Sequence, residues 1–227
     1  MAFGFERRMI MWKDQKKTMI ITILLILLPI IVGLIYWDQL PAVMATHFDA
    51  EGEANGWSSK WFAVIGLPIF LLAVHCLCAT LTGKDPRYQT YPKVMKKIVL
   101  WICPVVSWIG SLSIYAYELH WKIDMVTCIY LFVAVTFLVI GNYLPKIKWN
   151  YFLGIKLPWT YASEDNWNKT HRFGGKVWVV CGILFLLNVI WKVKFLEVAI
   201  MIAMILIPTV YSYLYYIKKE SKEDSND

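Results

Sequence analysis

The sequence "TMIITILLILLPIIVGLIYW", Thr18–Trp37, is a predominantly apolar run that contains no charged side chain. A helix of about 20 apolar residues is long enough to cross the roughly 30 Å hydrocarbon layer of a bilayer. The run is too long, and too well flanked by the segments after it, to be a cleaved signal peptide. It therefore predicts a transmembrane helix.

Further apolar runs succeed it along the chain, and the composition agrees with them. The 227 residues are 59% hydrophobic and 17% charged, whereas a soluble domain is about a quarter charged. A chain that is solvated largely by lipid explains this deficit of charge. We therefore expect an all-α, multi-pass integral membrane protein with about six transmembrane helices, at Thr18–Trp37, Trp61–Thr82, Ile98–Tyr117, Met125–Leu144, Val177–Trp191 and Phe195–Ile217.

Basic residues gather in alternate connecting segments. The N-terminal segment, the second loop, the fourth loop and the C-terminal tail carry most of the lysines and arginines. The opposite side carries only Lys60, Lys122, Lys192 and Lys194. Since basic residues near span ends are retained in the cytoplasm, we expect both termini to be cytoplasmic. The net charge of +7 then reflects topology and attraction to anionic lipid, not direct binding of nucleic acid.

The five cysteines all fall inside the predicted spans. They have neither the spacing of zinc ligands nor the pattern of a secreted disulfide framework. We interpret them as small apolar packing residues. We therefore expect no structural metal and no cofactor.

The first outward loop, residues 38–60, is acidic and has tryptophans near its edge. It carries one lysine, Lys60, against four carboxylates, Asp38, Asp49, Glu51 and Glu53. Such a surface attracts a cationic peptide or a metal ion. His47, Asp49 and Glu51 alternate and could line one face of an extended segment. Three interpretations stay open, namely a solvated turn, a ligand-recognition surface and a metal site.

The fourth loop contains the unusual segment "NYFLGIKLPWTYASEDNWNKTHRFGG", Asn150–Gly175. Gly154 and Pro158 interrupt its aromatic and apolar first half, so this half is no regular span. We expect it to lie among the lipid headgroups, with Trp159 as an anchor and Lys156 reaching toward phosphates.

The second half of this segment predicts a short interfacial helix that begins at Ser163. Trp167, Thr170 and His171 recur at helical spacing and form one face. Gly174–Gly175 is then expected to turn the chain sharply into the fifth span. The helix either only orients the flanking spans, or its face binds a partner or lines a pocket.

These motifs resemble a known family. "GNYLPK", "NYFLGIKLPWT" and the pattern S-E-x-x-W-x-x-T-H-R-x-G-G are similar to the signature of the SdpI family of bacterial membrane proteins. The namesake of the family is the immunity protein against a sporulation-delaying peptide toxin. The outer "LPAVMATHFDAEGEANGW" resembles the small membrane domain commonly found N-terminal to that signature. The resemblance covers roughly residues 18–82 and 125–191.

The resemblance and the loop chemistry together give two sets of candidate residues. The outer, ligand-binding set is His47, Phe48, Asp49, Glu51 and Trp57. The inner, partner-binding set is Asn142, Asn150, Gly154, Lys156, Pro158, Trp159, Trp167, Thr170, His171, Arg172, Gly174 and Gly175. The family more often has Arg-Thr where this chain has Lys156–Leu157, so the bidentate fork of arginine is lost and any grip on a phosphate or carboxylate is looser.

The resemblance implies a membrane immunity and signal-transduction protein of the bacterial cytoplasmic membrane. Such a protein binds a secreted toxic peptide, cationic or apolar, at its outer face. It can also hold a cytoplasmic helix-turn-helix repressor at the membrane. We divide the chain into residues 1–97, with the acidic loop 38–60, and residues 98–227, with the cytoplasmic signature loop 145–176.

A transporter or channel is an alternative function. Such proteins carry ionisable groups near the middle of the membrane, and His75 is the one clear example inside a predicted span. Pro29, Pro68, Pro104 and Pro208 could mark broken helices, although prolines also occur in spans without function.

A metal-dependent membrane enzyme is a further alternative. Glu164 and His171 are seven residues apart, so on one helical face they could act as base and orienting group or as metal ligands. The sequence contains no HExxH pattern and no nucleophile elbow. We therefore expect no enzymatic activity.

Overall fold

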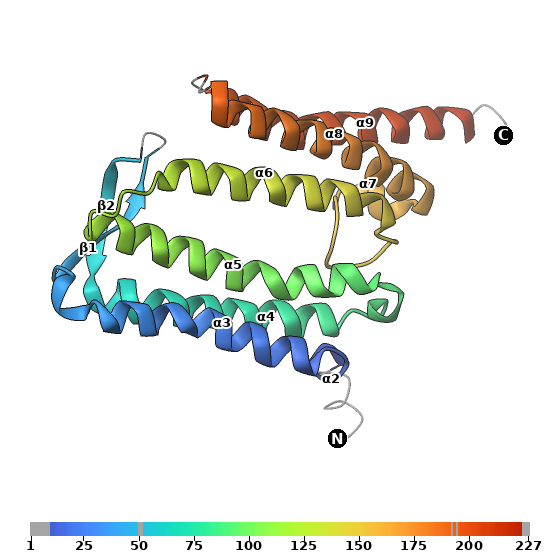
Figure 1. The fold of residues 1–227 in the computed structure, drawn as a ribbon. Helices are drawn as coiled ribbons and strands as arrows, with labels where there is room; N and C mark the ends of the chain where they lie inside the picture. The colour runs from blue at the N-terminus through green and yellow to red at the C-terminus, as the bar shows by residue number, and fades with distance from the viewer. Residues whose placement is uncertain (1–9, 50–51, 192, 194, 224–227) are drawn as a thin grey trace. The chain divides into compact units, whose positions relative to one another are not determined.

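The computed structural model describes residues 10–49, 52–191, 193 and 195–223. Its main elements are six long helices (Figure 1), and each is long and apolar enough to cross a membrane. The expectation of six long apolar helices is therefore confirmed. The helices are α3 (Lys16–Ile35), α4 (Leu67–Gly83), α5 (Lys93–Glu118), α6 (Met125–Tyr143), α8 (Glu164–Trp191) and α9 (Leu196–Glu223). The π-helical turn Phe62–Gly66 continues directly into α4, and the span counted here is Phe62–Gly83.

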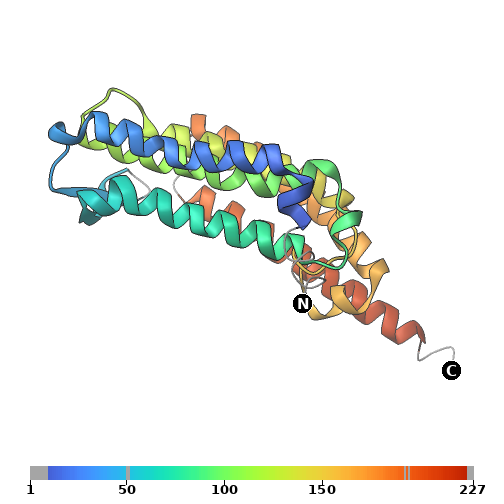
Figure 2. The ribbon, with the colours of Figure 1, turned by 90° about the horizontal axis from the view of Figure 1, so that it is seen from below.

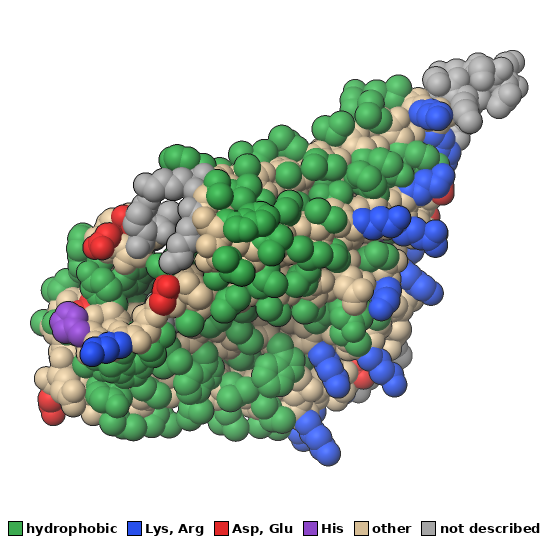
Figure 3. Space-filling view, turned by 45° about the horizontal axis from the view of Figure 1, so that its top comes forward, with side chains coloured by type: hydrophobic (Ala, Val, Ile, Leu, Met, Phe, Trp, Pro, Cys, Tyr) green, Lys and Arg blue, Asp and Glu red, His purple; other side chains and the backbone are tan. Residues whose placement is uncertain are grey.

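The flanks of these helices remain apolar on the outside. Leu24 is 62% exposed in α3 and Ile205 is 66% exposed in α9. The space-filling view shows hydrophobic side chains over most of this face of the molecule (Figure 3). Lipid must cover such flanks, because a helix satisfies its own backbone hydrogen bonds in hydrocarbon but cannot hide outward-facing apolar side chains by itself.

The chain forms two compact units. Unit 1 comprises the chain up to Tyr88 together with Lys93–Ile129, and unit 2 comprises Gln89–Pro92 and the chain from Tyr130 onward. Residues 98–118, which the sequence-based division assigned to the second region, lie in α5 and belong to unit 1. The division into domains at residue 97 itself stays a prediction.

Unit 1 is a bundle of α3, α4 and α5, which run alongside one another (Figure 2). Its core lies where Met44, Val64 and Tyr115 are all fully buried. The Tyr115 hydroxyl donates to the Pro29 carbonyl at 3.2 Å. A Cβ added at Gly33 would lie 2.5 Å from that hydroxyl oxygen, so glycine allows the tyrosine to cross α3 closely.

The N-terminal helix α2 (Ile10–Asp14) is tied to unit 1 by a polar cluster around Asp14. Tyr88 donates to the Asp14 carboxylate at 2.8 Å and Lys96 at 3.0 Å. Partial burial acts to raise the pKa of Asp14, but the hydrogen bonds from Tyr88 and Lys96 outweigh it and lower the pKa. Asp14 therefore stays ionised at neutral pH and anchors α2.

The loop between α3 and α4 forms a β-hairpin, which corrects the expectation of an all-α fold. Strands β1 (Val43–Phe48) and β2 (Ala54–Ser59) pair in antiparallel orientation. Gly52 has a φ of 86° in the turn between them, a backbone conformation that glycine adopts readily. Exposed and half-buried residues alternate along β2, as one packed and one solvated face requires. The polar composition of the loop concealed this alternation.

Unit 2 contains α6 from Tyr130 onward, α8 and α9, with α8 and α9 packed as a helical hairpin. Phe185 of α8 and Met204 of α9 lie in its buried core. At the connection between the two helices, the Asn188 side chain accepts a hydrogen bond from the Val193 N–H at 3.0 Å and donates to Glu197 at 3.1 Å. This amide closes the hairpin.

The expected interfacial helix with a glycine turn is wrong, because α8 runs without interruption from Glu164 to Trp191. Gly174 and Gly175 lie inside this helix. A Cβ at Gly175 would lie 2.7 Å from the Gly141 carbonyl oxygen and 2.8 Å from the Pro145 ring. The glycines therefore permit close approach of α8 to the end of α6, and they are needed for packing and not for a turn.

Gly175→Ala is expected to lower the free energy of unfolding in detergent by about 1–3 kcal/mol, because the added methyl group overpacks this contact. Gly110→Ala is the matched control, since an added Cβ at that helical position meets no atom within 4 Å. Chemical denaturation followed by tryptophan fluorescence measures both variants. Equal effects of the two substitutions would contradict the packing role.

Candidate functional site

The signature segment lies in unit 2, against the first turns of α8 and the last turns of α9. An irregular stretch from Ile147 to Leu157 leads into the short helix α7 (Pro158–Ala162), and α8 begins after Ser163. The Trp167 side chain is fully buried and its Nε1 donates to the Ile147 carbonyl at 2.8 Å. This bond attaches the start of the irregular stretch to α8.

His171 stacks on Trp167 with ring centroids 4.1 Å apart and is 1% exposed. The Ile155 N–H donates to Nε2 of His171 at 2.9 Å, and Nδ1 lies 2.7 Å from the Trp167 carbonyl oxygen. A carbonyl oxygen only accepts, so Nδ1 carries the hydrogen and the ring is neutral. Both ring nitrogens are therefore occupied by backbone groups, and neither is left for a metal ion or a proton transfer.

Gly154 allows this contact. Its φ of 106° lies in the region that favours glycine. A Cβ at Gly154 would collide with Nε2 of His171. Gly154 and His171 therefore depend on each other, because the turn at Gly154 brings the Ile155 N–H to the His171 ring.

Asn150 organises the preceding turn. The residue is fully buried, and its Oδ1 accepts hydrogen bonds from the N–H groups of Phe152 and Leu153 and from the Tyr91 hydroxyl, at 2.7–2.9 Å. Its Nδ2 donates to the carbonyls of Lys148 and Leu153. The amide holds the turn at residues 148–153 in shape, and all its hydrogen-bonding capacity is used.

Helix α7 begins at Pro158. Proline suits the first position of a helix because an N–H group at that position would have no partner within the helix. The Leu157 N–H donates to the Thr160 hydroxyl at 2.9 Å. Trp159 then turns toward α9, where its Nε1 donates to the Ser212 hydroxyl at 2.8 Å.

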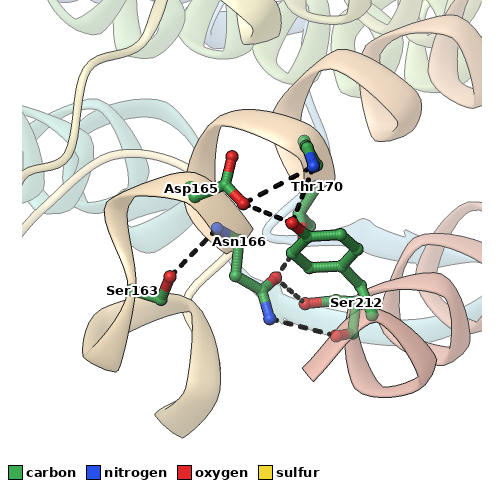
Figure 4. A network of polar contacts seen from close by, with 7 residues as sticks. Ser163, Asp165, Asn166, Thr170 and Ser212 are labelled. Atoms are coloured by element: carbon green, nitrogen blue, oxygen red, sulfur yellow. Dashed lines mark hydrogen bonds and ion pairs between the residues drawn. The ribbon is translucent and has the colours of Figure 1, made fainter. Parts of the chain in front are cut away.

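Asn166 joins α8 to α9 (Figure 4). Its Nδ2 donates to the Ser212 carbonyl at 3.1 Å, and its Oδ1 accepts from the hydroxyls of Ser212 and Thr170 at 2.9 Å and 2.8 Å. Sequence reasoning missed Asn166 and Ser212. The available signal was that Asn166 lies four residues before Thr170, hence on the same helical face.

The chain matches known proteins over these same segments. Residues 146–212 match the SdpI/YfhL protein family, and residues 24–72 match a domain of unknown function, DUF1648. The chain is also 25% identical over 210 residues to "Immunity protein SdpI" of Bacillus subtilis (strain 168). That alignment covers 89% of this chain and 97% of the relative. Over residues 146–212 the chain is therefore similar to the SdpI/YfhL family.

The family match ends at Ser212, the residue of α9 that hydrogen-bonds Asn166 and Trp159. The matched stretch therefore contains both the irregular segment and the helices that hold it. No solved structure matches the chain.

The remaining polar candidates of the inner set are exposed. Lys156 donates to the Phe152 carbonyl at 2.7 Å and so caps its own loop. Asn142 and Arg172 are exposed, and their side chains form no hydrogen bond or ion pair with any residue that the structure describes. Of the polar side chains in the inner set, these two are the ones available to a partner.

The outer candidates lie in the β-hairpin. His47 hydrogen-bonds Asn55 across the strands, and Phe48 packs edge-on against Tyr117 with ring centroids 5.1 Å apart. Asp49 accepts the Glu53 N–H at 2.9 Å and stabilises the turn. Trp57 is 60% exposed. Glu51 lies outside the described residues.

The metal interpretation of this loop finds no donor set in the described part of the chain, where no three His, Cys, Asp or Glu side chains converge. His47 and Asp49 each serve the hairpin itself through the contacts above. His47, Asp49 and Trp57 are all exposed. Among these three, Trp57 is the one whose side chain makes no hydrogen bond to a described residue.

The histidine of the transporter alternative lies in unit 1. His75 is fully buried in α4, and its Nε2 lies 3.1 Å from the Thr22 hydroxyl of α3. Its Nδ1 has no hydrogen-bond partner among the described residues. The ring joins two helices of the bundle, and nothing in its contacts requires transport.

His171→Ala is expected to lower the free energy of unfolding by about 1–3 kcal/mol, because the Ile155 N–H loses its acceptor inside the protein. Arg172→Ala, at the neighbouring exposed position, is expected to change it by less than about 0.5 kcal/mol. Denaturation in detergent measures both variants. A neutral His171→Ala would show that the histidine is free for another role.

Proposed function

We propose that this protein is a membrane immunity and signal-transduction protein that binds a secreted toxic peptide at its outer face and holds a cytoplasmic repressor at its inner face. The observation that carries the proposal is the similarity to Immunity protein SdpI over 89% of this chain and 97% of that protein. An alignment of this coverage spans both loops, and we infer from it that the two proteins share an outer and an inner surface.

The orientation belongs to this proposal. In unit 1, basic residues flank the ends where α3 and α5 begin and α4 ends, namely Lys13, Lys16, Lys17, Lys84, Lys93 and Lys97. In unit 2, they flank the end of α6, the start of α8 and the end of α9, namely Lys146, Lys148, Lys169, Lys176, Lys218 and Lys219. Because basic residues are retained in the cytoplasm, we infer that these ends lie inside and the β-hairpin outside.

Cysteine labelling tests the orientation. In a variant without the five native cysteines, Ser59→Cys is expected to react with a membrane-impermeant maleimide in intact cells. Asn168→Cys, which is also exposed, is expected to react only after the membrane is permeabilised. The opposite pattern would reverse the proposed roles of the two loops.

The proposed inner surface surrounds Arg172. The buried residues of the signature hold the irregular segment rigidly, through the His171, Asn150 and Asn166 hydrogen bonds described above. Arg172 is exposed next to these buried residues, and arginine is well suited to pair with carboxylates. We infer that Arg172 contributes to holding an acidic surface of the repressor.

The proposed function is not catalytic. The base that the enzyme alternative requires is His171, and both of its ring nitrogens are bound to backbone groups. A general base needs a free nitrogen within reach of the proton that it removes. The family relative is likewise named for immunity and not for a reaction.

A survival assay tests the function. A bacterium sensitive to the sporulation-delaying peptide toxin, with no immunity protein of its own, produces the chain and is exposed to the toxin. Higher survival than in cells with an empty vector is expected, because the protein at the membrane intercepts the peptide. Unchanged survival at equal amounts of protein in the membrane would count heavily against the proposal.

Arg172→Ala tests the role of the inner face independently of the outer face in the same cells. It is expected to protect as well as the wild type and to retain less repressor in the membrane fraction, because the substitution spares the fold and the outer hairpin. Equal retention by wild type and variant would remove Arg172 from the inner surface.

A further inference from the structure

The two edges of the outer β-hairpin differ. On the β1 edge, the Ala45 N–H donates to Glu118 Oε1 at 2.6 Å. Glu118 is the last residue of α5, so the end of this helix closes that edge. A free strand edge presents unpaired N–H and C=O groups to any extended chain.

The register defines which groups of β2 face away from β1. The Lys60 N–H donates to the Ala42 carbonyl at 2.9 Å, and the pairs Met44–Ser58 and Ala45–Trp57 continue the same register. In an antiparallel ladder, pairs bonded to each other alternate with pairs whose N–H and C=O groups point outward. Ala45–Trp57 is therefore an outward-pointing pair, and the bond of Ala45 to Glu118 agrees with this.

The β2 edge is open. The Trp57 N–H and C=O and the Ser59 N–H point away from β1, and no residue in the described ranges hydrogen-bonds the Trp57 backbone groups. The indole of Trp57 is 60% exposed, and that of Trp61 just beyond the strand is 65% exposed. Backbone groups for pairing and apolar surface for side chains thus occur at one edge.

The surrounding charge favours a cationic occupant. Unit 1 carries at the hairpin end the carboxylates of Asp38, Asp49, Glu53, Glu118 and Asp124. Of the two lysines there, Lys60 donates to the Trp37 carbonyl at 2.9 Å and lies over the Trp37 ring. Lys60 therefore makes its contacts within this protein. Lys122 is the other lysine at this end of unit 1.

We propose that a secreted, positively charged peptide binds this protein in extended conformation as a third strand along β2. Its backbone pairs with the Trp57 N–H and C=O and the Ser59 N–H, and its apolar side chains contact the exposed indoles. Strand addition of this kind takes affinity from main-chain hydrogen bonds and specificity from alternate side chains. The inference rests on the proposed function and names how the peptide is held.

Trp57→Pro and Trp57→Ala form the matched test. Both variants lose the indole, but only proline removes the outward N–H, and no bond between β1 and β2 is lost because Trp57 belongs to an outward-pointing pair. The probe is the fluorescently labelled sporulation-delaying toxin, titrated onto each protein in nanodiscs. Trp57→Pro is expected to bind up to about tenfold more weakly than Trp57→Ala, as for one lost hydrogen bond.

Equal affinities of Trp57→Pro and Trp57→Ala for the peptide would overturn strand addition while leaving the proposed function intact. Absence of binding and of protection by the wild type would instead overturn the proposed function. If Trp57→Pro unfolds at a lower temperature than Trp57→Ala, a difference in affinity could come from the fold. The peptide affinities of Ser59→Pro and Ser59→Ala are then compared in the same way. Disulfide cross-linking of Trp57→Cys between two copies without peptide would assign the edge to a homodimer and overturn the proposal.

Discussion

A polar group that is buried away from water, in hydrocarbon or inside the protein, needs a hydrogen-bond partner within the chain, and this constraint governs the described segments. Long helices satisfy it within themselves, and their apolar flanks face lipid. Where the chain leaves helical structure, it compensates with dense side-chain bonding. Asn150, His171 and Asn166 use their polar atoms almost entirely on nearby backbone and side chains. The signature segment is therefore a rigid polar element at the end of a helical bundle.

The same constraint explains the role of His171, the residue whose surroundings in the sequence most suggest chemical reactivity. A histidine among aromatic and charged neighbours suggests catalysis or metal binding. In the structure His171 is a neutral bridge between the Ile155 N–H and the Trp167 carbonyl, with Gly154 shaped to admit it. The residues left for a partner are ordinary exposed ones, above all Arg172. In a family signature of this kind, many residues hold a surface in shape, and only some of them form the surface itself.

The outer loop presents the complementary case. Most of its motif residues hold a small hairpin together, and the binding potential lies in the backbone of β2 and in one exposed tryptophan. Glu118 closes one edge of the hairpin while the other edge stays open. In the proposed mode of binding, such an edge has an advantage, because main-chain pairing tolerates variation in the side chains of the bound peptide.

The sequence by itself determined the membrane class, the six spans and the family resemblance, because hydropathy, length and local motifs are properties of contiguous residues. It did not determine the hairpin in the acidic loop or the continuation of α8 through Gly174–Gly175. Nor did it identify the partners Asn166 and Ser212, which are 46 residues apart. Each of these depends on a neighbour distant in the chain, such as the Gly141 carbonyl that lies against Gly175. Only tertiary packing decides whether a glycine turns a chain or lets two helices touch.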